Sequence, residues 1–221
     1  MLRIIADSTC DISKEDARKM GIQIVPISVR FGDEEFLDGV EITHEEFYTR
    51  LAECDELPKT SQPSPDTFMK VFNEAVAAGD DVLGIFISSD LSGTYQSACI
   101  AASEYEDKVY VVDSENVTVG EQILVDYAVS LINKNICVED IVKQLNTMKK
   151  RIRLVALLDT LEYLKKGGRI SSGAAFLGNV LSIKPVIAIA DGEVSFLGKA
   201  RGSKQGNNFL IQQVQAYGGI D

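Results

Sequence analysis

The sequence predicts an α/β protein in which helices flank a parallel sheet, followed by a second, smaller α+β domain that contains an antiparallel hairpin. Strand-like and helix-like segments alternate through the first part of the chain, which is typical of βα units. This alternation stops after Lys149-Lys150-Arg151. Further on, Asp191-Gly192 lies between two apolar runs and indicates a hairpin. We therefore expect two domains, residues 1–152 and 153–221.

The strands are predicted from short apolar runs that end in polar turns. Val82–Ile87 is almost continuously apolar, as expected for a strand buried on both faces of a sheet. Pro26 cannot donate a backbone hydrogen bond, so its segment belongs at a sheet edge or a bulge. In chain order the expected strands are residues 2–6, 22–31, 36–37, 82–87, 109–112, 154–158, 186–190 and 194–197.

The helices are predicted from their capping residues. Thr43 and Glu46 have the spacing of a capping box, and Ser64 followed by Pro65 suits a helix start. Gly21 and Gly79 are stop signals. The expected helices are about 13–21, 43–52, 64–79, 94–105, 120–133, 138–150, 160–166 and 203–217, with a helix of small residues before Ile183 and a loop over 60–65.

Charge and composition exclude several classes of function. The chain has 22 basic and 33 acidic side chains, so its net charge is -11. Nucleic-acid binding requires a positive surface, and anionic lipid surfaces repel such a chain. The longest apolar run, Leu154–Leu158, is far too short to span a membrane, and no signal peptide is visible. We expect neither nucleic-acid binding nor stable membrane anchoring.

The cysteines and the histidine exclude further chemistry. The four cysteines are widely spaced, which favours scattered thiols in a reducing cytoplasm. His44 is the single histidine, which excludes most metal sites and most Ser-His or Cys-His catalysis. No cofactor or metal is expected.

Three polar segments each stand before a helix: Asp7-Ser8-Thr9, Thr60-Ser61 and Ser88–Thr94. Ligands of open parallel sheets bind beyond the carboxyl ends of the strands, and helix N-termini favour anions. Ser92-Gly93-Thr94 supplies two hydroxyls and a glycine that lets a ligand approach the backbone. None of the segments contains lysine or arginine, so a singly charged carboxylate or an amide fits better than a polyphosphate. Alternatively, Ser61 and Ser92 only cap helices or complete turns.

An enzyme is the first alternative. Ser92 does not lie in a G-x-S-x-G motif, and His44 at a helix start is more typical of a surface residue than of a general base. Asp7 and Asp113 each end a strand, so paired-carboxylate chemistry or magnesium binding is a further alternative. Hydrogen bonds that brace loops are the plainer interpretation of both carboxylates.

Basic residues gather in the second half of this acidic chain. They form either a solvated helix end, where cations complement the helix dipole, or a docking surface for an acidic partner or a phosphate. The residues are Lys165, Lys166, Arg169, Lys184, Lys199, Arg201 and Lys204.

Taken together, these segments resemble the DegV family. The matching motifs occur in the family's order and extend over nearly the whole chain. They are Asp7-Ser8-Thr9, Thr60–Ser64, Ser88–Ala98, Val112-Asp113-Ser114, Leu161–Ile170, Ile183-Lys184-Pro185 and Lys199-x-Arg201-Gly202.

The resemblance implies a two-domain protein without enzymatic activity that binds one long-chain fatty acid and presents its carboxylate to a partner, a fatty acid kinase. The family's head-group residues correspond to Thr60, Ser61 and Ser92, next to Gly93 and Thr94. Arg169 and Arg201 match positions linked to kinase docking or phosphate handling. A hydrolase or transferase using Ser92 or Asp7/Asp113, and a regulatory scaffold with a vestigial pocket, are the alternatives.

The chain departs from the family pattern at its end. Family members usually continue for several tens of residues and carry a histidine there, close to the carboxylate. This chain ends at Asp221 with no histidine after His44, so we expect the second domain to be incomplete.

Overall fold

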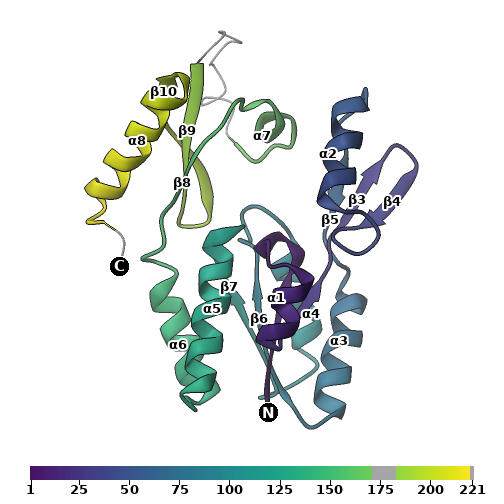
Figure 1. Cartoon of the computed structure of the whole chain (residues 1–221). Coiled ribbons are helices and arrows are strands. Elements are labelled where there is room, and N and C mark those ends of the chain that lie inside the picture. Colours follow the sequence, from purple (N-terminus) through teal and green to yellow (C-terminus); the bar gives the residue numbers. More distant parts are fainter. Residues whose placement is uncertain (171–182, 220–221) are drawn as a thin grey trace. The chain divides into compact units, whose positions relative to one another are not determined.

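The computed structural model describes residues 1–170 and 183–219, and the helix of small residues predicted before Ile183 lies outside this part (Figure 1). The chain divides into two compact units, Met1–Lys149 and Lys150–Asp221. We call them unit 1 and unit 2 and describe each by itself. The predicted fold class is confirmed: a parallel sheet with helices in unit 1 and an antiparallel sheet in unit 2.

The main sheet of unit 1 has four parallel strands in the order β2-β1-β6-β7. Apolar side chains of β1 and β6, the two central strands, are buried, which explains their nearly continuous apolar sequences. The strands are β1 (Leu2–Asp7), β2 (Gln23–Val25), β6 (Asp81–Phe86) and β7 (Val109–Asp113).

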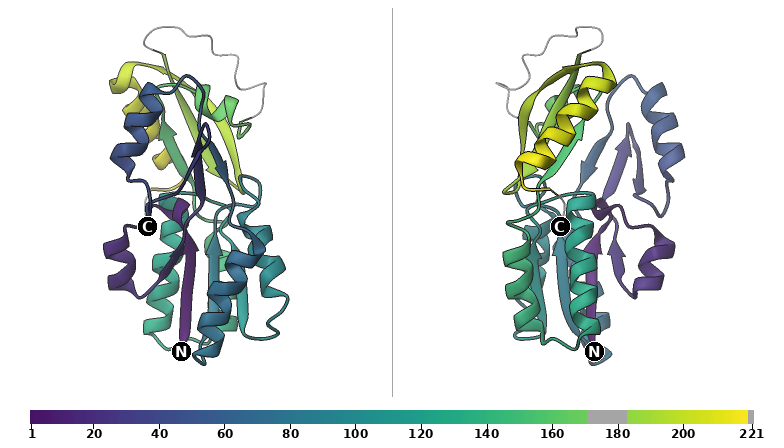
Figure 2. Two further views of the ribbon diagram at one scale, coloured as in Figure 1. Left: turned by 90° about the vertical axis from the view of Figure 1, so that its right-hand side faces the viewer. Right: turned by 60° about the vertical axis from the view of Figure 1, so that its left-hand side comes forward.

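Helices cover both faces of this sheet (Figure 2). On one face, Phe68 and Phe72 of α3 pack with Phe86 of β6 in a buried aromatic cluster. The predicted caps Thr43 and Ser64 are confirmed, because each accepts a hydrogen bond from the first turn of its helix, and Ser13 caps α1 in the same way. The helices are α1 (Lys14–Met20), α2 (His44–Glu53), α3 (Pro65–Ala77), α4 (Thr94–Ala102), α5 (Val119–Asn133) and α6 (Val138–Met148), with a 3₁₀ turn η1 (Ser8–Cys10).

A second, antiparallel sheet in unit 1 has the strand order β4-β3-β5. Pro26 separates β2 from β3, so the segment predicted as one interrupted strand belongs to two sheets. The strands are β3 (Ser28–Phe31), β4 (Glu34–Leu37) and β5 (Lys59–Ser61). The prediction that Thr60 and Ser61 lie in a loop is therefore wrong, because they pair with Val29 and Ser28 of β3.

Unit 2 contains a three-stranded antiparallel sheet in the order β10-β9-β8, on which α8 packs. The predicted hairpin is confirmed: Asp191 and Gly192 have φ values of 52° and 91°, as a tight turn of positive φ requires. Gly206 of α8 is packed so closely that a β-carbon there would lie 2.3 Å from a methyl group of Leu157. The elements are β8 (Leu154–Leu157), α7 (Glu162–Lys166), β9 (Ile183–Ala190), β10 (Glu193–Arg201) and α8 (Gly202–Ala216).

Candidate functional site

Ser92 lies in the turn that joins β6 to α4. Its backbone N–H donates to the carbonyl of Ser88 at 3.1 Å, and its Oγ accepts a hydrogen bond from the backbone N–H of Thr94 at 3.3 Å. The hydroxyls of Ser92 and Thr94 are 2.9 Å apart, and Thr94 is completely buried while Ser92 is partly exposed. When the buried Thr94 hydroxyl donates, the Ser92 proton is free for a ligand.

Gln62 connects the Thr60-Ser61 segment to this turn. Its side-chain Nε2 donates to Ser97 Oγ of α4 at 3.0 Å. A β-carbon on Gly93 would lie 2.1 Å from Gln62 Oε1, so glycine at this position leaves room for the Gln62 side chain where it lies. The structure therefore brings the chain just after Ser61 against the N-terminus of α4. Gln62 was given no role from the sequence, although it lies within one of the matching family motifs.

Asp7 is completely buried at the carboxyl end of β1. Its Oδ1 accepts hydrogen bonds from Thr9 N–H (2.9 Å) and Thr9 Oγ1 (2.6 Å), and its Oδ2 accepts one from Ile87 N–H (2.9 Å). Burial raises the pKa of Asp7, and these three donors oppose that rise. The prediction that Asp7 braces loops is confirmed, because it joins η1 to the segment that follows β6.

Glu121, in the first turn of α5, is a buried carboxyl that sequence reasoning missed. Its Oε2 lies 3.1 Å from Thr9 Oγ1, and its Oε1 has no hydrogen-bond partner among the described residues, 1–170 and 183–219. Burial, and then the charge of Asp7, hold the pKa of Glu121 well above its usual range. Thr9 has one hydroxyl proton, which it gives to Asp7 at the shorter distance. A protonated Glu121 therefore donates to Thr9, which in turn donates to Asp7.

Asp113, at the end of β7, also braces loops. Its Oδ1 accepts hydrogen bonds from the backbone N–H groups of Glu115 (2.8 Å) and Ser89 (3.3 Å). The loop-bracing prediction is thus confirmed for Asp113 as well. Within the part of the chain that the structure describes, no three acidic, histidine or cysteine side chains gather where they could hold a metal ion.

Arg169 and Arg201 both belong to unit 2 and are exposed. Arg169 follows α7, and its Nη1 donates to the carbonyl of Gly167 at 2.6 Å. Arg201 ends β10, and its backbone N–H donates to Gln205 Oε1 at 3.0 Å. Lys184 forms an ion pair with Asp159. Arg201 thus ends a strand and Arg169 lies in the loop after α7, and both are on the surface of unit 2.

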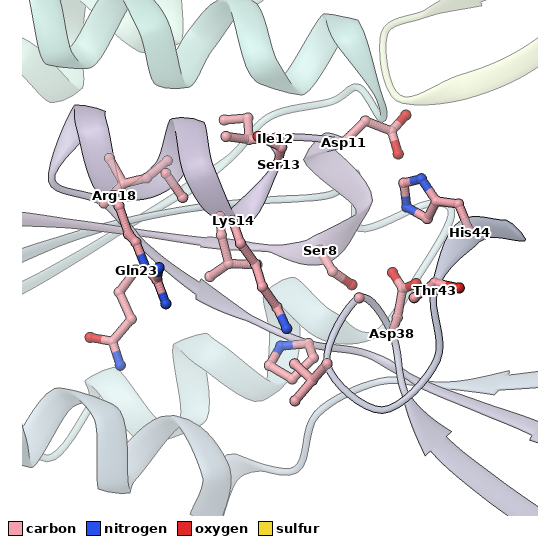
Figure 3. Close-up of a pocket in the computed structure, with 16 residues that line it drawn as sticks. Ser8, Asp11, Ile12, Ser13, Lys14, Arg18, Gln23, Asp38, Thr43 and His44 are labelled. Atoms are coloured by element: carbon pink, nitrogen blue, oxygen red, sulfur yellow. The ribbon is translucent and has the colours of Figure 1, made fainter. Parts of the chain in front are cut away.

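A cavity of about 580 Å³ lies elsewhere in unit 1, between α1, β2 and the segment from Asp38 to His44 (Figure 3). Its walls include none of the predicted head-group residues Thr60, Ser61 and Ser92. His44 does line it and is exposed.

No helix in the described ranges is both long and apolar enough to cross a bilayer.

The protein is thus a two-unit α/β protein. The turns after β1 and β6 are rich in hydroxyl groups and contain no lysine or arginine, and they lie where the parallel strands of unit 1 end. A family model described as "Uncharacterised protein, DegV family" matches residues 1–219. The chain belongs to the DegV family.

Relatives and solved structures agree with this assignment. A DegV domain-containing protein of Clostridium perfringens is 40% identical over 213 residues, which cover 96% of this chain and 76% of the relative. A Thermus thermophilus DegV family structure, described by its fatty acid binding, has a TM-score of 0.90 at 35% identity and covers 98% of this chain and 77% of its own. A fatty acid (stearic acid)-binding protein of Eubacterium ventriosum has a TM-score of 0.89 at 34% identity, with coverage of 98% and 76%.

Proposed function

We propose that this protein binds one long-chain fatty acid and holds its carboxylate at Thr60, Ser61 and Ser92, beside Gly93 and Thr94. The observation that carries the proposal is the similarity to the solved Thermus and Eubacterium proteins, whose descriptions name fatty acid or stearic acid binding, over 98% of this chain.

Local geometry supports this head-group site. The contact between Gln62 and Gly93 holds the residues after β5 against the start of α4. The Ser92 hydroxyl has a proton to donate when it accepts from Thr94, and the N-terminus of α4 favours negative charge. A single carboxylate matches this set of donors, which lacks lysine and arginine.

Affinity would come from the tail and orientation from the head. Burying about 14 methylene groups contributes roughly 11 kcal/mol before the costs of association, at ~0.8 kcal/mol each. Hydrogen bonds to the carboxylate contribute only about 1–3 kcal/mol each. A shorter acid therefore loses affinity steadily, whereas an ester of the same length loses only the contribution of the head.

We further propose that the bound carboxylate is presented to a fatty acid kinase, with Arg169 and Arg201 in contact with the kinase or its phosphate, and that the protein has no catalysis of its own. Neither a histidine nor a carboxylate is a hydrogen-bond partner of Ser92 in residues 1–170 and 183–219, so Ser92 lacks a general base there. Purified protein should not hydrolyse acyl esters. Turnover that Ser92→Ala abolishes would favour the hydrolase instead.

The first test is mass spectrometry of lipid extracted from the purified protein. We expect about one long-chain fatty acid per chain. Protein without lipid that also fails to bind added palmitate or oleate would overturn the proposal and would favour a scaffold with a vestigial pocket.

The second test compares palmitate with its methyl ester. Ser92→Ala should weaken palmitate binding roughly 5–30-fold, corresponding to about 1–2 kcal/mol, and leave ester binding nearly unchanged. Ser103→Ala is the control, because Ser103 lies at the other end of α4 and its hydroxyl donates to Ile100 O. Equal palmitate affinity in all three proteins would assign Ser92 to the turn alone.

A further inference from the structure

The cavity between α1 and β2 is separate from the proposed head-group site and has the size of a small-molecule site. Its volume is about 580 Å³, within the range of roughly 300–1,000 Å³ that is typical of ligand pockets. Its floor is apolar and well packed: Ile12, Ala17 and Ile22 are at most 9% exposed. The walls around this floor carry charged and hydroxyl groups (Figure 3).

Two cations stand on one wall. Lys14 and Arg18 are four residues apart on α1, so they project from one face of the helix, and both side chains reach along the cavity in Figure 3. Neither forms an ion pair or a side-chain hydrogen bond with any residue in 1–170 or 183–219. Lys19 of the same helix is instead paired with Glu15 at 2.8 Å and Asp16 at 3.3 Å. Lys19, which does not line the cavity, is therefore neutralised by acidic residues of its own helix. Lys14 and Arg18, which do line the cavity, are not.

Two carboxylates stand at the other end. Asp11 and Asp38 lie near His44, and the Asp11 carboxylate and the His44 ring point toward each other (Figure 3). Desolvation raises the pKa of Asp11, His44 opposes the rise, and the charge of Asp38 adds to it. Neither carboxylate has a hydrogen bond or an ion pair within the described ranges. Asp11 also has a φ of 57°, a left-handed conformation at the end of η1.

We propose that this cavity binds a small zwitterion with an apolar body, of the class of apolar amino acids and short apolar peptides. Its carboxylate would face Lys14 and Arg18, its ammonium would face Asp11 and Asp38, and its side chains would cover Ile12, Ala17 and Ile22. In this arrangement each pair of side chains with the same charge faces a ligand group of the opposite charge. A fatty acid carries one charge and cannot satisfy both ends, so the site is distinct from the one proposed above.

The experiment is a titration of the full chain, followed by two-dimensional NMR, with leucine, Leu-Leu and Leu-Leu-Leu. The tightest of these is then compared with its N-acetyl derivative, which lacks the ammonium, and with its C-terminal amide, which lacks the carboxylate. We expect each derivative to bind about 3–10-fold more weakly than the zwitterion, since both contacts are partly exposed to solvent.

Two variants assign the ends. Asp11→Asn should weaken binding of the zwitterion and the amide about 3–10-fold and leave the acetylated compound unchanged. Lys14→Gln should weaken binding of the zwitterion and the acetylated compound and leave the amide unchanged. Lys19→Gln, which removes the paired cation of the same helix, is the matched control and should change nothing. Thermal melting of each variant confirms that it is folded.

Several results would overturn the proposal. These are no saturable binding of any of the three zwitterions at millimolar concentration, a derivative that binds as tightly as its parent, or an equal effect of Lys19→Gln and Lys14→Gln. Displacement of the peptide by one equivalent of palmitate would show that the two ligands share a site, which also contradicts it. Unchanged peptide binding in Ser92→Ala, with palmitate binding weakened, would separate the two sites.

Discussion

Two groups of titratable side chains lie close together in the fold and have opposite surroundings. Asp7 and Glu121 are completely buried and are joined through the hydroxyl of Thr9. Asp11 and Lys14, a few residues further along the chain, line an open cavity without a side-chain hydrogen bond or ion pair in residues 1–170 and 183–219. The first group receives its donors from the folded chain. The second group has no such fixed donors: apart from the nearby charge of His44, which opposes the burial-driven rise in the pKa of Asp11, it faces solvent or a ligand.

The comparison shows that one short segment, η1 and the start of α1, carries both kinds of side chain. Fixed donors at Thr9 and Ile87 make the buried carboxylate part of the architecture. The cavity charges carry no such role, so changing them should affect binding rather than folding. Four predictions test this division, beginning with the largest effect on stability.

Asp7→Ala should be strongly destabilising. It leaves the buried N–H group of Ile87 and the partly buried N–H group of Thr9 without acceptors. Each unsatisfied group costs about 1–3 kcal/mol, so the loss should be about 2–6 kcal/mol. Urea denaturation measures it. Asp11→Asn, in which asparagine also tolerates the left-handed conformation, is the control, with an expected change below about 0.5 kcal/mol. Equal losses of unfolding free energy in the two variants would contradict the distinction between the buried carboxylates and the cavity charges.

Thr9→Val should have the second largest effect on stability. Valine keeps the shape of threonine but removes the hydroxyl that connects the two carboxyls, so Glu121 loses its one described side-chain partner and Asp7 keeps two donors. We expect a loss of about 1–3 kcal/mol. Thr147→Val, at an exposed position on α6, is the matched control. A loss no larger than in this control would show that the hydroxyl does not connect the carboxyls.

Glu121→Gln tests the protonation of this group. Because the folded-state pKa of Glu121 is raised, the folded protein holds a proton that the unfolded chain releases above its ordinary pKa. This group therefore makes stability fall as pH rises from the unfolded pKa up to the folded pKa, with a slope of at most about 1.4 kcal/mol per pH unit.

The amide that replaces this carboxyl in Glu121→Gln has no proton to lose, so the variant should lose the fall in stability that begins above the ordinary glutamate pKa of 4.5. Denaturation of both proteins above that pKa measures the difference. The buried Asp7 titrates in both proteins and cancels in the comparison to first order. Identical pH profiles would place the buried proton on another group.

Lys14→Gln should have the smallest effect. Its side chain has no ion pair or hydrogen bond within the described ranges, so we expect a stability change below about 0.5 kcal/mol by thermal or urea denaturation. A larger loss of stability would mean that Lys14 stabilises the fold, as Asp7 and Glu121 do.

Local signals predicted most of the fold. The capping box at Thr43 and the turn at Asp191-Gly192 act over a few residues, so the sequence alone shows them. The strand Lys59–Ser61 was missed because all three residues are exposed and only pairing with β3 makes them a strand. Three exposed residues carry no periodicity from which a strand could be predicted.

The candidate sites depended more on contacts between distant parts of the chain. Glu121 has the sequence appearance of an ordinary acidic residue in a first helical turn, and only the position of β1 beside α5 buries it. Gln62 acts through Gly93, and the cavity joins α1 to the segment after β4. The position of Ser92 in a turn was predicted correctly, because that turn follows a strand whose apolar run is plain in the sequence.

The small sheet β4-β3-β5 also has a consequence for the entropy of folding. In the central strand pair, Leu2 of β1 lies opposite Asp81 of β6. Forming this pair closes a loop that contains all the residues between them, and that closure costs entropy. Residues 28–61, which begin with β3 and end with β5, form a large part of that connection. Loop-closure entropy grows only with the logarithm of length, so this segment adds about 0.5 kcal/mol to the closure. A parallel sheet can thus carry an antiparallel module within one of its crossovers at little entropic cost, provided that the module folds on its own local contacts.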